Sequence, residues 1–273
     1  MEKEALVRTL LSELAPVLVA FSGGVDSTVL LKLALDELGP GRVLAVTAHG
    51  DVHTQEELAA AREAAARLGA RHLVIHTKEL AIPGFATNPP ERCFLCRGTM
   101  YGRLVDMARA EGLKTVIDGV NHDDGADYRP GVRAAAARGV RSPLAEAGLS
   151  KQEVRALGKR LGLSNWDLPA SPCLASRFPY GEEITPAKLR AVADGERYLK
   201  TLGFSDVRVR HHGDLARVEV SGDDIARAAE GSIRRGIVSH LRDLGYVYVT
   251  LDLGGFRSGS LNEVLGTGAT PEE

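Results

Sequence analysis

The sequence lacks several features that would mark particular classes of protein. No stretch of about 18 consecutive apolar residues occurs, so a membrane-spanning helix is not expected. The N-terminus, MEKEALVRTLLSELAP, reads as a charged amphipathic helix and not as a secretory signal peptide, which predicts a cytoplasmic protein. Basic residues are not in excess, because 34 Lys and Arg stand against 36 Asp and Glu, a formal net charge of -2. This balance provides no general field for a polyanion and argues against an RNA substrate.

Cysteine is also scarce, with three residues in a chain of 273. An odd number of thiols in a reducing compartment is better explained by metal binding or catalysis than by disulfides. Cys93 and Cys96 follow two prolines and stand three residues apart, which we place just before a helix so that both sulfurs face one centre. A CxxC pair alone also fits half a zinc site or a redox pair. The third thiol, Cys173, lies in a proline-rich stretch.

The chain is organised around residues 16–31, PVLVAFSGGVDSTVLL, which predict a buried strand, a glycine turn and a helix. Such a turn directs successive N–H groups toward an anion at the positive end of the helix, and a carboxylate coexists there with phosphate when Mg²⁺ bridges them. No Lys-Ser/Thr pair closes the loop, which excludes a Walker A motif. The alternative is that Asp26 or Ser27 only caps the helix. The residues expected to bind ATP phosphates and Mg²⁺ are Ser22, Gly23, Gly24, Asp26 and Ser27.

Strand-like and helical segments alternate over the first half of the chain, which predicts an α/β fold with a doubly wound parallel sheet and ligands at the carboxyl ends of its strands. We expect a nucleotide-binding domain over residues 1–164 and an ordered proline-rich loop carrying Cys173 over 165–186. Residues 187–273 should form a smaller α+β domain.

An acidic stretch, DGVNHDDGADYRPG, follows the fourth expected strand at residues 118–131. Asn121, Asp123 and Asp124 are candidates for the nucleotide side of the site, because several carboxylates near a triphosphate require Mg²⁺ or arginine. The alternative is a surface turn, in which Gly, Asn and Asp are common.

A β-hairpin is expected over residues 206–220, with its turn at Gly213. Valine alternates there with Arg208 and Arg210 on one strand and with Arg217 and Glu219 on the other. Alternation of this kind is typical of a sheet with one solvated face.

Five ordered motifs, SGGVDS, NPPERCFLC, GVNHDDGADYRPG, SPL and PASPCLASRFPYG, resemble those of the LarE family of PP-loop sulfur transferases along nearly the whole chain. The resemblance implies an ATP pyrophosphatase fold, related to the adenine nucleotide alpha hydrolases, with a substrate domain. It implies an enzyme that adenylates a carboxylate of pyridinium-3,5-biscarboxylic acid mononucleotide and converts it to a thiocarboxylate for the nickel-pincer nucleotide of lactate racemase. The stretch AHGDVHTQEEL departs from the family pattern and leaves adenine recognition open.

The resemblance also implies how sulfur is supplied, and the family has two styles. In one, the cysteine of the PCLASR motif, here Cys173, gives up its own sulfur. In the other, that cysteine joins a CxxC to hold a 4Fe-4S cluster with one open iron that can carry sulfide. Cys93, Cys96 and Cys173 match the second style, whereas structural zinc would normally require four protein ligands. With Asp26, these cysteines are the expected catalytic residues.

Guanidinium groups suit carboxylate and phosphate, so the resemblance makes four arginines candidates for substrate anions and two glutamates candidates for metal binding or proton transfer. They are Arg177, Arg208, Arg210, Arg257, Glu196 and Glu219. Expected partners are the nucleotide substrate, a sulfide source, other proteins of nickel-pincer nucleotide biosynthesis and further copies of the chain in a homo-oligomer. Neither nucleic acid nor membrane is expected.

Three other functions compete with this interpretation. A PP-loop tRNA thiolase can also use three cysteines, but the charge balance argues against it. An amide ligase of the NAD synthetase type would use the loop and leave the cysteines idle. A non-catalytic nucleotide sensor would need neither the acidic stretch nor the thiols.

Overall fold

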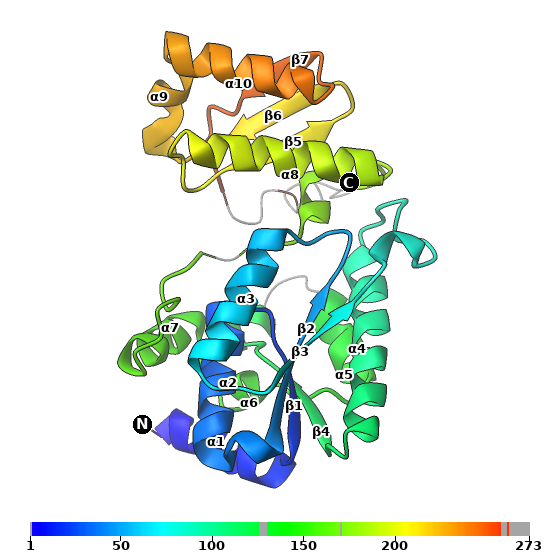
Figure 1. Cartoon of the computed structure of the whole chain (residues 1–273), viewed down its shortest axis with the longest axis vertical. Coiled ribbons are helices and arrows are strands. Elements are labelled where there is room, and N and C mark those ends of the chain that lie inside the picture. The colour runs from blue at the N-terminus through cyan, green and yellow to red at the C-terminus, as the bar shows by residue number, and fades with distance from the viewer. Residues whose placement is uncertain (1, 126–129, 170, 258–260, 262–273) are drawn as a thin grey trace, which may run out of the picture. The chain divides into compact units, whose positions relative to one another are not determined.

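The computed structural model describes residues 2–125, 130–169, 171–257 and 261, and the chain folds into two compact units (Figure 1). The first unit contains residues 1–85 and 90–171, and the second contains 86–89 and 172–273. The expected loop 165–186 is therefore divided between them. Residues 86–89 join the second unit because their backbone and side chains bond to residues 178–184.

A four-stranded parallel sheet in the order β3-β2-β1-β4 forms the centre of the first unit, which confirms the expected α/β fold. Its strands are β1 (Val17–Ala20), β2 (Val43–His49), β3 (His72–His76) and β4 (Thr115–Asp118). Its helices are α1 (Glu2–Leu14), α2 (Val25–Leu38), α3 (Gln55–Arg67), α4 (Arg92–Ala110), α5 (Pro130–Ala137), α6 (Pro143–Glu146) and α7 (Lys151–Arg160). Short 3-10 turns are η1 (Pro40–Arg42), η2 (Glu79–Ala81) and η3 (His122–Gly125).

The sheet is buried on both faces because β1 directs alternate apolar side chains to opposite sides. Val17 and Val19 belong to one core, together with residues of α1, α2, α3 and α7. Leu18 belongs to a second core with residues of α4 and α5. All three side chains are fully buried, and each contributes about 1.5–3 kcal/mol by leaving water. Since β1 lies between β2 and β4, the loop after it stands at the middle of the carboxyl edge.

Helix α4 begins earlier than its sequence indicates. The sequence predicts a helix that starts after Cys96, but α4 begins at Arg92. Cys93 and Cys96 therefore lie inside the helix, in its first and second turns, and not before it. The prolines at 89 and 90 come just before this start, where they cannot interrupt the helical hydrogen bonds.

The second unit has a three-stranded sheet in the order β5-β6-β7, in which β5 pairs antiparallel and β7 parallel to β6. Its elements are η4 (Leu174–Arg177), α8 (Pro186–Thr201), β5 (Arg208–His212), β6 (Leu215–Glu219), η5 (Gly222–Asp224), α9 (Ile225–Ala229), α10 (Gly231–Asp243) and β7 (Tyr248–Leu251). The expected hairpin turns at Gly213, where φ is +60°. Its valines pack with α8 and α10 in a separate core. Within the part of the chain that the structure describes, no helix combines the length and apolar character that crossing a bilayer requires.

The opposite face of the hairpin is solvated only in part, although its charge alternation indicated a fully solvated face. Arg210 is 6% exposed and Glu219 is 1% exposed. The two side chains are buried together because their charges meet in a two-point ion pair. Part of the alternating face is therefore a buried polar site, while Arg217 beside it is 37% exposed.

We expect the stability of the second unit to depend on pH, because the histidine at position 211 is buried. Burial, followed by the charge of Lys188, lowers the pKa of His211, which lies 3.1 Å from the Tyr246 hydroxyl and 3.6 Å from Glu182. Below the usual histidine pKa the unfolded chain binds a proton that the folded chain does not, so folding stability is lost as pH falls. The free energy of unfolding in urea should decrease from about pH 7.5 to about pH 5.5, and His211→Gln should reduce that slope. His122→Gln, at an exposed position, should leave it unchanged.

Candidate active site

The turn after β1 is shaped by two glycines. Gly23 has φ +78°, and a Cβ added there would lie 2.8 Å from the Cα of Ala61 in α3, so only glycine fits. Gly24 is the N-cap of α2 and has no side chain to cover the N–H groups of the first helical turn. Asp26 and Ser27 lie inside that turn, so neither is the cap. The helix therefore presents its positive end to an anion.

Two serines brace this turn from within. Ser27 Oγ accepts a hydrogen bond from Ser22 N at 3.3 Å and donates one to the Gly24 carbonyl at 3.1 Å. Ser22 Oγ lies 3.1 Å from Ser27 Oγ and accepts from Gly24 N at 3.3 Å. Ser27 is buried, while Ser22 is exposed. Ser27 thus fixes the loop, and Ser22 can offer its hydroxyl to a ligand.

Asp26 stands at the mouth of the turn with two partners from distant parts of the chain. Its Oδ1 accepts from Asn121 Nδ2 at 3.3 Å, and its Oδ2 forms an ion pair with Lys151 Nζ. The Asp26 and Lys151 side chains are 21% and 31% exposed, so both can reach a ligand. A carboxylate oxygen suits Mg²⁺, and the lysine provides a positive charge for phosphate. These donors fit a Mg²⁺-triphosphate.

Lys151 was not found from the sequence, although the loop clearly lacked a lysine of its own. It is the first residue of α7, directly after the Ser150 cap. A positive charge at a helix N-terminus is unfavourable, because it lies at the positive end of the helix dipole. The lysine at this expected helix start could therefore have been recognised as a functional residue. The lysine absent from the loop is therefore supplied by another helix.

Gly119 and Asn165 hold the loop in place, and sequence reasoning missed both. A Cβ at Gly119 would lie 2.7 Å from Ser27 N, so the chain after β4 passes directly against the first turn of α2. Asn165 Nδ2 donates to the Gly23 carbonyl and to Thr28 Oγ1, each at 2.9 Å. Asn165 is 8% exposed. Gly119 stands in the motif GVNHDDGADYRPG, but nothing in that motif indicates its contact with α2, and no motif contains Asn165.

Adding one methyl group at Gly119 should displace the phosphate loop. Gly119→Ala should cost about 1–3 kcal/mol of stability, because the clash is with backbone that cannot rotate away. It should also raise the KM for ATP, since the Ser27 backbone moves. Urea unfolding and ATP titration check both effects. Gly41→Ala is the matched control because nothing lies within 4 Å of its added Cβ; an equal response in both variants would contradict this account.

The acidic stretch after β4 is used in two ways. Asn121 is 2% exposed and reaches Asp26, so it belongs to the loop site. Asp123 Oδ2 accepts from Lys151 N at 2.8 Å, and Asp124 Oδ2 accepts from Asn121 N at 3.0 Å. These carboxylates therefore orient Lys151 and Asn121. The remaining part of the stretch, residues 126–129 with Asp127, lies outside the described residues.

The loop after β2 belongs to the stretch AHGDVHTQEEL, for which the sequence indicated no mode of adenine recognition. Hydrogen bonds attach this loop to η2. Asp51 N donates to Glu79 Oε2 at 2.8 Å, and Leu80 N donates to Asp51 Oδ2 at 3.1 Å. Glu79 is 2% exposed and also accepts from the Thr77 hydroxyl. Burial and the neighbouring histidines lower the pKa of His49, which favours its neutral form. In the ranges that the structure describes, no group of three or more His, Cys, Asp or Glu is placed to hold a metal ion.

Four of the six substrate-site candidates in the second unit form two buried ion pairs. Arg177 Nε and Nη2 donate to the two oxygens of Glu196, both at 2.8 Å. Arg210 Nε and Nη2 donate to those of Glu219 at 2.9 and 3.0 Å. Each guanidinium thus binds one carboxylate through two parallel hydrogen bonds. The same geometry suits a substrate carboxylate or phosphate.

The two ion pairs hold the turn that carries Cys173. Arg177 Nη1 donates to the carbonyl of Pro172 at 2.5 Å and to that of Cys173 at 3.2 Å. Arg210 Nη1 donates to the Ser176 carbonyl at 2.8 Å. The guanidinium groups therefore fix the backbone on both sides of the thiol.

Arg208 differs from its neighbours on the hairpin. None of the ion pairs among the described residues includes it, and its guanidinium lies 4.8 Å from the centre of the Phe256 ring. Burial, followed by the charge of Arg177, lowers its pKa. The positive charge of Arg208 is thus not balanced by a paired carboxylate among the described residues and would attract an anion. Among the six candidates, Arg208 is therefore the best placed to bind a substrate anion. Arg257 is exposed on the segment after β7.

All three cysteines are half-buried thiols. Cys93 and Cys96 lie in the first two turns of α4, where a spacing of three residues puts both sulfurs on one helix face. Cys173 directly precedes η4 in the second unit. Three thiols, two of them on one face, fit the donor chemistry of an iron–sulfur cluster.

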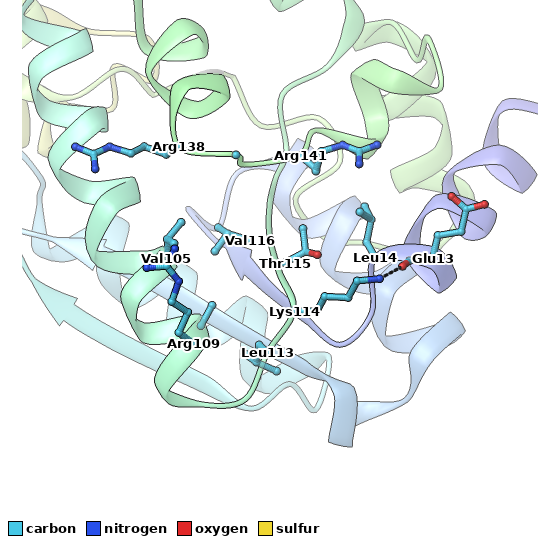
Figure 2. A pocket seen from close by; sticks show the side chains of 12 residues that line it. Glu13, Leu14, Val105, Arg109, Leu113, Lys114, Thr115, Val116, Arg138 and Arg141 are labelled. Carbon is cyan, nitrogen blue, oxygen red and sulfur yellow. Dashed lines mark hydrogen bonds between the residues drawn. The ribbon is translucent and has the colours of Figure 1, made fainter.

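A cavity of about 550 Å³ lies at the opposite edge of the sheet, where β1 and β4 begin, and Figure 2 draws the residues that line it. Lys114 Nζ donates to the Glu13 carbonyl at 2.8 Å. Arg138 and Arg141 extend in opposite directions (Figure 2). The positive groups therefore do not converge on a ligand. Because ligands of parallel sheets bind at the carboxyl ends of the strands, we place the active site at the other edge.

A parallel sheet whose central strand leads through SGGVDS into a helix, with Asp26 and Lys151 at its mouth, defines a PP-loop nucleotide-binding enzyme. The asparagine synthase family matches residues 4–89. The chain is 43% identical over 264 residues to the pyridinium-3,5-bisthiocarboxylic acid mononucleotide synthase of Lactiplantibacillus plantarum, covering 96% of this chain and 95% of that protein. The chain therefore belongs to the LarE family of PP-loop, ATP-dependent sulfur transferases, as its motifs indicated.

Two further relatives cover most of the chain. One, an uncharacterized protein of Synechocystis sp., is 47% identical over 95% of this chain and 96% of its own length. Another, from Methanocaldococcus jannaschii, is 27% identical over 89% of this chain and 91% of its own length. The similarity therefore extends across both units and is not confined to the nucleotide-binding part.

Proposed function

We propose that the chain uses ATP to adenylate a carboxylate of pyridinium-3,5-biscarboxylic acid mononucleotide and then replaces oxygen by sulfur. The product would be the thiocarboxylate ligand of the nickel-pincer nucleotide, the cofactor of lactate racemase. The observation that carries this proposal is a PP-loop site with Asp26 and Lys151 in a chain similar over nearly its full length to a bisthiocarboxylic acid mononucleotide synthase.

Adenylation begins when a substrate carboxylate oxygen attacks the α-phosphorus of ATP. The bond to the β-phosphate breaks, and pyrophosphate leaves. The α2 N-terminus and the Ser22 hydroxyl would bind the phosphates, and Lys151 would stabilise the charge that grows on the departing pyrophosphate. Asp26 would hold Mg²⁺, which would offset the negative charge of the phosphates.

Sulfur transfer follows on the acyl adenylate. A sulfide sulfur adds to the carbonyl carbon, and AMP leaves with the original carboxylate oxygen. Arg208 would bind the substrate phosphate or its second carboxylate, because its fork is not used by a neighbouring carboxylate. The Arg177 and Arg210 pairs would keep the Cys173 turn and the hairpin in register.

Cys93, Cys96 and Cys173 would hold a 4Fe-4S cluster, which would supply the sulfide for the transfer. Sacrificial donation from Cys173 is the second candidate, favoured by the hydrogen bonds that fix the backbone of this one thiol. The same proposal places the protein in the cytoplasm, as a homo-oligomer that works with other enzymes of cofactor assembly and not with RNA.

Anaerobic turnover with the pyridinium substrate, ATP and sulfide tests the proposal. We expect AMP and pyrophosphate in equal amounts, together with a product whose mass shows exchange of oxygen for sulfur. Nicotinic acid mononucleotide, which carries one carboxylate, is the matched control for substrate recognition. Release of ADP and phosphate would contradict adenylation, and tight, salt-sensitive tRNA binding would favour a tRNA thiolase instead.

A further inference from the structure

Asn88 has an unusual backbone conformation in the second unit. Its φ is +54°, and it is the one residue other than glycine with positive φ among those that the structure describes. Its side chain is fully buried. Asparagine tolerates this left-handed region better than most residues, yet a buried non-glycine residue there remains uncommon. The conformation therefore requires support from the surrounding contacts.

Those contacts fasten residues 86–89 to the chain that follows Cys173. Asn88 Nδ2 donates to the carbonyls of Phe178 at 3.3 Å and Pro179 at 2.6 Å. The backbone adds two bonds, from Gly181 N to the Asn88 carbonyl at 2.9 Å and from Ile184 N to the Ala86 carbonyl at 2.8 Å. The amide thus provides a donor to two successive carbonyls, one buried and one partly buried. Glycine could adopt the same φ but would leave both carbonyls without this donor.

The fastened segments lie next to the two cysteine sites in the sequence. Cys93 follows Asn88 by five residues, and Phe178 follows Cys173 by five residues. A five-residue segment spans at most about 17 Å, whereas the chain between Cys96 and Cys173 is long enough to allow far greater separations. Helix α4 begins at Arg92, so only Pro90 and Glu91 connect the fastened segment to the helix of the cysteine pair.

We propose that Asn88 is a positioning residue for the three-cysteine site. By joining the segment that enters α4 to the segment that leaves the Cys173 turn, it limits how far the cysteine pair and the third thiol can separate. This inference rests on the proposed cluster function, although the joining of the two segments does not depend on which atom binds the thiols.

Replacement of Asn88 by glycine tests the proposal, because glycine keeps the backbone conformation and removes the amide. In metal-free protein, bridging of Cys93 or Cys96 to Cys173 by dibromobimane, mapped on peptides, should be about tenfold slower than in the wild type. Iron and sulfide bound after anaerobic reconstitution should fall in parallel. ATP binding should be unchanged, since the loop after β1 is in the other unit.

Val218→Ala is the matched control. Val218 is 1% exposed in the core of the second unit, so the variant loses stability without touching Asn88. It should bridge its thiols and bind iron as the wild type does at a temperature where both are folded. Wild-type bridging in Asn88→Gly would overturn the inference, as would an equal loss in Val218→Ala. If the wild type takes up no iron but bridging still depends on Asn88, the cluster proposal fails and the positioning role stands.

Discussion

Asp26→Asn is expected to lower ATP-dependent pyrophosphate release by about 10²- to 10³-fold, the effect seen when one group that stabilises transition-state charge is removed. Asparagine keeps the shape and the contact with Asn121, but it removes the negative charge that would hold Mg²⁺. It also leaves Lys151 without its ion-pair partner. Release of radiolabelled pyrophosphate in the presence of substrate measures the effect.

Asp36→Asn is the matched control for this prediction. Asp36 lies on the same helix, α2, and is paired with Lys32 at 2.5 Å on a partly exposed surface. Exposed pairs of this kind contribute little, so turnover should remain close to wild type. If Asp26→Asn retains normal pyrophosphate release while binding ATP, the carboxylate has no part in catalysis. If it merely weakens folding, unfolding in urea will shift and Lys151→Met will not share the defect.

Single Cys→Ala changes at Cys93, Cys96 and Cys173 should each abolish both the cluster and sulfur transfer. Three thiolates are the minimum for a cluster with one open iron, so no pair of them can replace the set. Protein purified without oxygen should be brown, and each variant should be colourless and low in iron. Pyrophosphate release during adenylation should persist in all three, because it depends on the PP-loop.

A sacrificial enzyme would give a different pattern across the same variants. Only Cys173→Ala would lose activity, because Cys93 and Cys96 would have no part in the chemistry. The spent protein would be lighter by about 34 Da, the mass of the hydrogen sulfide that separates cysteine from dehydroalanine. That mass loss in an active, iron-free preparation would decide against the cluster.

The sequence predicted the sheet and the PP-loop because both depend on local pattern. Apolar runs, glycine turns and cap residues are contiguous in the chain, and the family motifs are as well. It could not predict contacts between distant segments. Lys151 reaches Asp26 across 125 positions, and Asn165 reaches Gly23 across 142. The fold creates these neighbours, and no short motif contains both partners.

The hairpin shows a second kind of limit. Alternating valine and charge has the same appearance whether the polar face meets water or a set of opposite charges. What buries Arg210 and Glu219 is that their charges neutralise each other and their hydrogen bonds are satisfied, which requires knowing that they face one another. Periodicity identifies the two faces of a strand but not what covers them.

Residues 86–89 belong to the second unit although the chain before and after them belongs to the first. No single break in the chain therefore separates the two units. Truncation after Ser171 would leave Asn88 without its two hydrogen-bond acceptors. The C-terminal fragment would lack residues 86–89, which bond to residues 178–184. A fragment limited to the first part of the chain would therefore still carry residues 86–89, whose hydrogen-bond partners lie in the second unit. We therefore expect that replacing the second unit by that of a relative will succeed only when residues 86–89 are replaced with it.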